Sequence, residues 1–377
     1  MRLLQPGMID DPYPSYAHWQ ANHPIWQDDQ TGHWVLTRHT DVHQVLRNHA
    51  QFSSAAMGNG GNPLPLLSDD PPRHTELRGI VNRAFTSRML KKMESTVSDI
   101  ADEMILNVDA GKPLDIVKAL TIPLPVVVIS RMMGIPEERM DDFKHWSDAM
   151  TGTLAGATKD ELMSAVMEMA AFFQGLIPER RANPGDDLVS AVVNSEVDGK
   201  TLSDNDIIGF NILLLIAGNE TTTNLLGNLL NVLQHRPELW QELRAHPERI
   251  DAAIEELLRY DSPVQFLMRT ATQDMEFYGQ PVAAGENVTV ITGAANRDPR
   301  VFEAPQEFNL ARPKGRHFSL GFGIHFCIGA PPARLEARTA MTALLAKFDG
   351  VEPGVGESRR VQSQLLRGFE KLPLKFG

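Results

Sequence analysis

Cys327 is the only cysteine in the 377-residue chain, and the residues around it favour chemistry at its sulfur. It lies in residues 317–336, HFSLGFGIHFCIGAPPARLE, where glycines such as Gly329 let the backbone turn tightly and approach a flat, bulky group. Pro331 and Pro332 are typical of the first turn of a helix. At a helix N-terminus, unpaired N–H groups and the helix dipole favour the thiolate over the thiol. The segment therefore predicts a thiolate that can bind iron.

Two other interpretations of this segment stay open on the residue types alone. A single buried cysteine is most often a small apolar core residue. His325 and Cys327 could also hold a structural metal, although one thiol without a cluster of partners makes a poor zinc site. A metal analysis would separate these alternatives.

A second group that could do chemistry lies in a long apolar helix predicted over residues 203–235, roughly 50 Å at about 1.5 Å per residue. Its middle, FNILLLIAGNETTTNLL, places Ala217, Gly218, Glu220 and Thr221 between apolar turns. A carboxylate buried there is costly unless it is paired or hydrated. The alternative is a kinked helix whose acid faces solvent.

Two charged pairs have helical spacing. His74 and Arg78 are four residues apart, so they share one helix face, and two cations on one face attract anions. Glu256 and Arg259 are three residues apart and could pair, but surface pairs of this type are common and weak. Because either pair alone is also typical of a solvated helix surface, neither identifies a site by itself.

The spacing Gly-x-Gly-x-His-x-Cys-x-Gly around Cys327, followed by Ala333 and Arg334, resembles the haem-binding loop of the cytochrome P-450 family. The resemblance covers nearly the whole chain. It implies haem b, iron protoporphyrin IX, with Cys327 as the axial thiolate ligand of the iron. Leu320 stands where the family usually has phenylalanine, a change that bears on the redox potential more than on haem binding; Pro332 stands where leucine is usual. The residues implied to bind the cofactor are His74, Arg78, Arg269, His325, Cys327 and Gly329.

The resemblance also implies a catalytic role for the polar segment of the long helix. This segment would lie over the distal face of the haem, where Gly218 makes room for dioxygen. Glu220 and Thr221, with ordered water, would deliver the protons that dioxygen cleavage requires.

Two further sets of residues follow from the resemblance. A structural network that supports the haem loop is implied for Glu256, Arg259 and Arg312. The expected walls of the substrate pocket are Phe266, Leu267, Met268, Ala217 and Phe369.

The elements that must position these residues are mostly helices. Residues 90–194 predict successive helices, and the runs HWVLT and VQFLMRTAT predict short strands. Residues 53–67, rich in glycine and proline, predict a loop, which the resemblance makes the lip of the substrate pocket. Residues 365–376 predict a β-hairpin. We therefore expect one mainly α domain with small β-sheets over residues 1–377, the cytochrome P-450 fold, with the haem between the long helix and the helix after the cysteine.

Composition narrows the class of protein. The formal charge of −12, from 36 Lys and Arg against 48 Asp and Glu, argues against a nucleic-acid partner. A single cysteine excludes an internal disulfide. The first residues do not resemble a signal peptide, and no apolar run reaches the roughly 18 to 20 residues that span a bilayer. We expect a cytoplasmic protein with no membrane partner.

The activity implied by the resemblance is that of a monooxygenase, which activates O2 with supplied electrons and hydroxylates or epoxidises an apolar small molecule. The chain shows no flavin or iron–sulfur module, so a separate ferredoxin and ferredoxin reductase are expected to supply the electrons, with the ferredoxin approaching the Cys327 side. A monomer is expected. Desaturation, oxidative coupling and direct use of peroxide remain alternatives, although Glu220 and Thr221 argue against an obligate peroxide user. A haem-thiolate sensor or electron carrier without catalysis is a more distant alternative.

Overall fold

The fold is mainly helical, with short strands gathered into small sheets, as predicted. The computed structural model describes residues 1–3, 5, 7–55, 64–84, 87–143, 145–146, 149, 158–197 and 200–377. Residues 56–63, most of the expected pocket loop, lie outside the described residues. The helices are α1 (Tyr13–Asn22), α2 (His39–Arg47), α3 (Arg73–Ala84), α4 (Ser87–Leu106), α5 (Pro123–Met132), α7 (Lys159–Ala182), α8 (Leu188–Val193), α9 (Asp204–Gln234), α10 (Pro237–Ala245), α11 (Ile250–Tyr260), α12 (Thr292–Ala295) and α13 (Ala330–Lys347).

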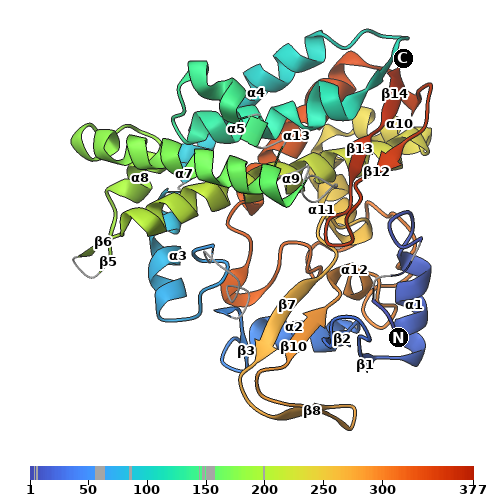
Figure 1. Ribbon diagram of the computed structural model, residues 1–377. Coiled ribbons are helices and arrows are strands. Elements are labelled where there is room, and N and C mark those ends of the chain that lie inside the picture. The colour runs from blue at the N-terminus through green and yellow to red at the C-terminus, as the bar shows by residue number, and fades with distance from the viewer. Residues whose placement is uncertain are drawn as a thin grey trace.

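Helix α9 runs through the middle of the helix-rich part of the molecule and packs against α5, α7, α11 and α13 (Figure 1). It starts where the sequence predicts, because the hydroxyl of Ser203 accepts the N–H of Asp206 at 3.2 Å and so caps the first turn. Its second half is almost wholly buried, and each buried leucine contributes about 1.5–3 kcal/mol relative to exposure. These leucines include Leu225, Leu226, Leu229, Leu230 and Leu233.

The largest sheet has the strand order β1-β2-β10-β7-β3 and lies at the end of the molecule opposite α4 and α5 (Figure 1). Both faces of β2 are buried: Trp34 and Leu36 join one apolar cluster, and Val35 joins a second cluster around α1. The strands of this sheet are β1 (Ile25–Gln27), β2 (Trp34–Leu36), β3 (Phe52–Ser53), β7 (Leu267–Ala271) and β10 (Asn287–Val290).

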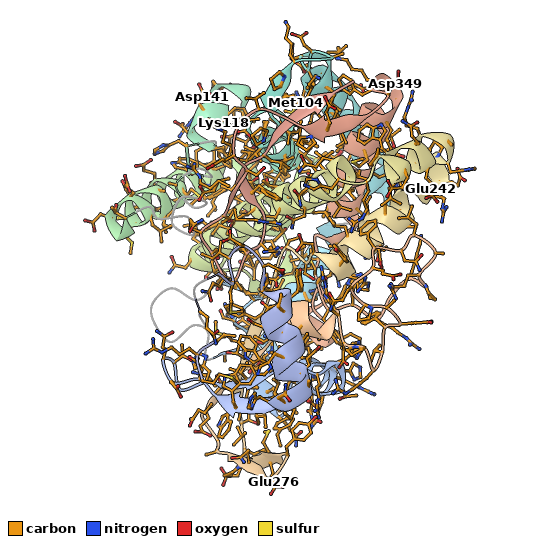
Figure 2. The ribbon with its side chains drawn as sticks, turned by 90° about the vertical axis from the view of Figure 1, so that its right-hand side faces the viewer. Met104, Lys118, Asp141, Glu242, Glu276 and Asp349 are labelled. Atoms are coloured by element: carbon orange, nitrogen blue, oxygen red, sulfur yellow. The ribbon has the colours of Figure 1, made fainter. Side chains whose placement is uncertain are left out.

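The smaller sheets have two or three strands. Strand β14 lies between β11 and β4, and the other strands form the pairs β12-β13, β5-β6 and β8-β9. In the turned view of Figure 2, Glu276 of β8 marks one end of the molecule, and Met104 and Asp349 lie at the other. The strands are β4 (Pro113–Asp115), β5 (Glu196–Val197), β6 (Lys200–Thr201), β8 (Met275–Phe277), β9 (Gln280–Val282), β11 (Val351–Pro353), β12 (Arg359–Arg360), β13 (Phe369–Lys371) and β14 (Pro373–Phe376).

The predicted hairpin over residues 365–376 is wrong. β13 pairs with β12, whereas β14 pairs with β11 and β4, so the two strands belong to different sheets. Only Leu372 separates them, and a hairpin turn needs about two residues to reverse the chain. The N–H of Leu372 instead donates to the carboxylate of Asp115 at 3.0 Å, which ties this point to the end of β4.

Helix α13 brings the cysteine segment into the helical core, where it packs against α4, α9 and α11. Pro331 and Pro332 stand in its first turn, as predicted. This packing places the residues that follow Cys327 directly beside the central helix α9. Among the described residues, no helix combines the length and apolar character needed to cross a bilayer.

Candidate active site

Two glycines hold the backbone before Cys327 in a tight loop. Gly321 and Gly323 have φ angles of +69° and +68°, in the left-handed region that side chains disfavour. A Cβ at Gly323 would lie 2.8 Å from the carbonyl oxygen of Leu46, so the loop also packs directly on α2. The N–H of Cys327 donates to the carbonyl oxygen of Leu320 at 2.8 Å and closes the loop. Side chains at the two glycines would therefore disturb the position of the sulfur.

The sulfur of Cys327 lies just before α13. The backbone N–H groups of Gly329 and Ala330 and the charges of Arg78 and Arg334 all favour its ionised form, in the direction that the sequence predicts. Burial has the larger effect and raises the pKa of Cys327. The helix start therefore favours the thiolate, as predicted, but burial opposes this effect. A metal cation bound to the sulfur supplies the additional positive charge that ionisation needs.

Four nitrogen-bearing side chains from three distant segments gather beside the cysteine loop: His74, Arg78, Arg269 and His325. The rings of His74 and His325 lie 4.3 Å apart between centroids. Arg78 donates to the carbonyl oxygen of Phe326, the residue before the cysteine. Burial, with the nearby charges of Arg269 and His74, lowers the pKa of His325 to about 3. We call these four residues the basic group.

The basic group has little anionic compensation within the protein. Neither ring nitrogen of His74 has a hydrogen-bond partner among the described residues. Arg269 is 6% exposed and burial lowers its pKa to about 10, yet its guanidinium donates only to a backbone carbonyl in the described part of the chain. Asp70 is the acid whose charge reaches it, and the Asp70 carboxylate accepts bonds from Ser53 and Ser54. Because the pKa values of His74 and His325 are lowered, Arg78 and Arg269 carry the positive charge of the basic group. A ligand with two carboxylates would offset that charge and accept bonds from the ring nitrogens, so the basic group fits the propionates of a haem.

The polar segment of α9 combines a buried acid with an uncovered helix face. Burial raises the pKa of Glu220 to about 8, and its Oε1 has no partner among the described residues. Glu220 is therefore mostly protonated at neutral pH. The hydroxyl of Thr221 donates to the carbonyl oxygen of Ala217 at 3.0 Å. Ala217 is exposed and Thr221 half-buried, so this face of α9 has room for a ligand.

Gly218 lies on another face of the same turn. A Cβ there would lie 3.4 Å from the side chain of Ile129, in van der Waals contact with α5. Its expected role in making room for dioxygen stays a prediction.

Glu256, Arg259 and Arg312 form a closed, buried network. Arg259 donates to both carboxylate oxygens of Glu256 at 2.8 and 2.9 Å, and Arg312 donates to one of them at 3.1 Å. The backbone N–H of Asn309 adds a bond of 2.9 Å to the same carboxylate. Arg259 also donates to three backbone carbonyls, two of them at residues 296 and 307. The network therefore joins α11 to the segment that leads to the cysteine loop.

The residues expected to wall the substrate pocket are dispersed among three apolar clusters. Phe266 packs with the cluster around α1, Leu267 with the cluster of the largest sheet, and Phe369 with the main helical core. Met268 is half-buried in β7, next to Arg269. Their contact with a substrate stays a prediction.

Two residues of the site, Glu255 and Ser54, were missed from the sequence. Glu255 accepts hydrogen bonds from His317 and Arg334, and these bonds, against the effect of burial, lower its pKa to about 2. Glu255 therefore connects α11 to both ends of the cysteine segment, at His317 and Arg334. Ser54 bonds Nε2 of His325 at 3.0 Å. The position of Glu255 next to Glu256 in the chain was a signal that Glu255 lies near the site. Nothing in the sequence relates Ser54 to His325, which is 271 residues away.

The helical fold, the cysteine loop and the basic group together define a haem-thiolate protein. A family model described as Cytochrome P450 matches residues 20–376. The chain belongs to the cytochrome P450 family, and its resemblance to that family is confirmed. It is a cytochrome P450 monooxygenase whose cofactor is a haem.

Proteins of similar sequence and structure are bacterial cytochromes P450. Putative cytochrome P450 YjiB of Bacillus subtilis is 37% identical over 354 residues, which cover 90% of this chain and 88% of the relative. Erythromycin C-12 hydroxylase of Saccharopolyspora erythraea is 36% identical over 388 residues, covering 99% and 96%. The crystal structure of CYP109E1 from Bacillus megaterium in complex with testosterone has a TM-score of 0.90 and 35% identity, covering 97% and 99%.

Proposed function

We propose that this monooxygenase binds haem b, with Cys327 as axial ligand, and hydroxylates or epoxidises an apolar small molecule as a single haem domain over residues 1–377. The observation that carries the proposal is the uncompensated basic group beside the only cysteine. Bound haem supplies an iron whose thiolate ligand donates electron density that favours O–O cleavage. Erythromycin and testosterone, which appear in the names of two similar proteins, are small molecules and support a substrate of that size class.

Glu220 and Thr221 are the residues of this chain that hold and orient protons in the proposed reaction. At pH 7 Glu220 retains its proton, because its pKa of about 8 lies above that pH. Loss of that proton leaves a buried charge, which is costly, so the equilibrium favours reprotonation of Glu220. The Thr221 hydroxyl, held by the carbonyl oxygen of Ala217, faces the uncovered side of α9, where ordered water can relay the proton.

The proposed electron donors are a separate ferredoxin and ferredoxin reductase. A cavity of about 440 Å³ beside the first turns of α13 is lined by Lys91, Arg334 and Arg338 and by one acid, Glu94. Phe326, next to the cysteine, is 41% exposed. Arg334 and Arg338 pair with Glu255 and Asp251, so Lys91 and the exposed ring of Phe326 are the groups that would contact an acidic protein partner close to the sulfur.

The first experiment is the absorption spectrum of purified protein reduced with dithionite under carbon monoxide. We expect the red-shifted Soret band of a thiolate-ligated haem in the wild-type protein, and its loss in Cys327→Ser. Haem content and circular dichroism of both proteins serve as controls for folding. A wild-type protein that takes up no haem, or a variant that keeps the red-shifted band, would contradict the proposal.

A further inference from the structure

A cavity of about 500 Å³ lies where α1, the ends of α9 and α11, and β12 meet. Apart from His235, its charged lining consists of four arginines and two aspartates, an excess of two positive charges in a chain whose formal charge is −12. Its volume is typical of sites for small molecules. We call it the basic cavity; its charged residues are Asp11, Asp261, Arg236, Arg297, Arg360 and Arg367.

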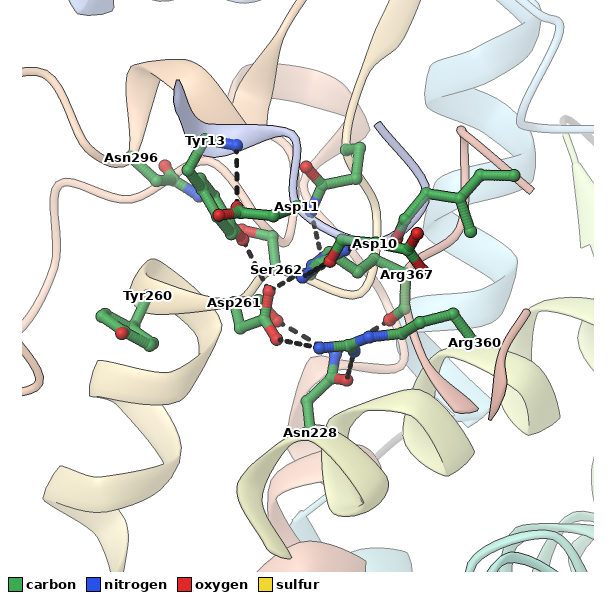
Figure 3. Close-up of polar contacts among 12 residues, drawn as sticks. Asp10, Asp11, Tyr13, Asn228, Tyr260, Asp261, Ser262, Asn296, Arg360 and Arg367 are labelled. Atoms are coloured by element: carbon green, nitrogen blue, oxygen red, sulfur yellow. Dashed lines mark hydrogen bonds and ion pairs between the residues drawn. The ribbon is translucent and has the colours of Figure 1, made fainter. Parts of the chain in front are cut away.

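Two of the four arginines are fully engaged by the protein. Arg367 donates to the carboxylate of Asp261 and to two backbone carbonyl oxygens at 2.9 and 3.0 Å (Figure 3). Arg297 donates to the carbonyl oxygen of Tyr260 and to Oε1 of Gln306, each at 2.8 Å. These contacts tie the N-terminal segment and the loop after α12 to the end of α11. Both arginines therefore have a structural role that needs no ligand.

The positive charge of Arg360 is compensated less well by the protein. One face of its guanidinium stacks on Phe369 at 3.9 Å from the ring centroid, and Nη1 donates to Asn228 at 3.0 Å. Its ion pair with Oδ2 of Asp261 is long, at 3.7 Å, whereas Arg367 and Tyr13 both bond Oδ1 of the same carboxylate (Figure 3). The side chain is only 15% exposed, and burial lowers the pKa of Arg360 to about 10. In the described part of the chain, its remaining edge donors make no hydrogen bond to an anion.

Arg236 is the second arginine with free donors. Its guanidinium stacks on Tyr260 and Phe308 at 5.7 and 5.9 Å, and it makes no hydrogen bond or ion pair within the described part of the chain. Asp11, the other acid of the basic cavity, accepts the N–H of Tyr13 at 3.2 Å. The two rings lie beside the guanidinium of Arg236, whose N–H groups have no acceptor in the described part of the chain and can donate to a ligand.

We propose that the basic cavity is an anion-binding site, in which the free edge donors of Arg360 and Arg236 hold the oxyanion of a small molecule, either a phosphate or a carboxylate. Planar guanidinium edges match both oxyanions, which accept paired N–H bonds. The excess of positive charge and the small number of acids on the lining select against cations. The site is distinct from the basic group beside Cys327 and does not depend on the proposed substrate.

The test is titration calorimetry of the haem-loaded protein with inorganic phosphate in one series and citrate in the other, at an ionic strength held constant with sodium chloride. We expect saturable binding of at least one anion, and an affinity at least about tenfold lower in Arg360→Gln and in Arg236→Gln. Arg181→Gln is the matched control, since it removes the same charge from a surface ion pair with Asp204. Its affinity should equal that of the wild-type protein. Preference for phosphate or citrate tells the two oxyanions apart.

The proposal is overturned if neither anion binds saturably, or if both cavity variants bind as tightly as the wild-type protein. It is also overturned if Arg181→Gln weakens binding as much as they do, because the effect is then one of net charge. Arg360 is buried, so its variant can lose stability; Arg236→Gln, at a half-buried position, decides the matter in that case. An unchanged carbon monoxide spectrum in both variants separates this site from the haem site.

Discussion

Glu256 and Glu220 are both buried glutamates on helices of the same core, but their surroundings are opposite. The Glu256 carboxylate receives three hydrogen bonds from two arginines and one from a backbone N–H. Glu220 is equally hidden, at 7% exposure, and its Oε1 has no partner in the described part of the chain. The first carboxylate is stabilised as an anion inside a structural network. The second is held neutral by burial, with a pKa of about 8.

Under the proposed function, the two glutamates have different roles, one in structural support and one in proton transfer. A buried charge with every partner in place holds segments together, and removal of one member leaves the others uncompensated. A buried acid without partners adds little to the fold, but it holds a proton that it can give up. The basic group beside Cys327 resembles Glu220 because it too has few partners within the protein, which leaves its charges available to a ligand. The following variants test the distinction.

The largest effect is expected from Glu256→Ala. This change leaves Arg259 and Arg312 buried without their carboxylate, which should lower the free energy of unfolding by about 3–5 kcal/mol. Urea unfolding followed by tryptophan fluorescence measures the loss. Glu248→Ala is the control, since that side chain is 71% exposed, and its effect should stay within about 0.5 kcal/mol. A small loss in Glu256→Ala would show that the network does not support the fold.

Glu220→Gln should act on turnover instead of stability. The amide keeps the shape of the side chain but cannot give up a proton in the same way, so product formation should fall by about 10²-fold or more. The spectrum of the carbon monoxide complex should stay the same. Product formation is measured with any substrate that a screen identifies, under saturating reductant. Wild-type turnover in the variant would remove Glu220 from the proton path.

The pH dependence of stability follows from the same residue. Its pKa rises from 4.5 to about 8 on folding, so between these pH values the folded state binds a proton that the unfolded state releases. The free energy of unfolding should therefore fall as pH rises through this range. Glu220→Gln lacks this contribution, so the variant should gain stability relative to the wild-type protein from pH 5 to 8. Urea unfolding at several pH values measures the difference, and a difference that does not change with pH would contradict it.

The smallest change is expected for Thr221→Ala. Loss of the hydroxyl on the uncovered face of α9 should leave reductant consumption nearly unchanged but divert most of it from product to peroxide or water. The ratio of product to consumed reductant is the measurement. Thr222→Ala is the matched control, because the next hydroxyl is buried and lies 3.4 Å from the carbonyl oxygen of Gly218. Equal coupling in both variants would assign the proton delivery elsewhere.

Local patterns let the sequence determine several elements. The long apolar run with Ser203 at its start predicted α9, because a cap and an apolar period act within a few residues. Pro331 and Pro332 likewise predicted the first turn of α13. The spacing around Cys327 identified the family, and the pairing of Glu256 with Arg259 could be proposed from their three-residue separation.

Tertiary structure alone decided the features that depend on distant segments. Because β13 and β14 are adjacent in the chain, the local sequence predicted that they form one hairpin. In the structure they pair with strands of two different sheets. The basic cavity brings Arg236 together with Arg360 across more than a hundred residues. Burial, which no window of sequence reports, raises the pKa of Cys327 and that of Glu220. The sequence by itself predicted which groups could carry the chemistry. Folding decided their charge, because the free energy of a charge depends on the solvent and partners around it.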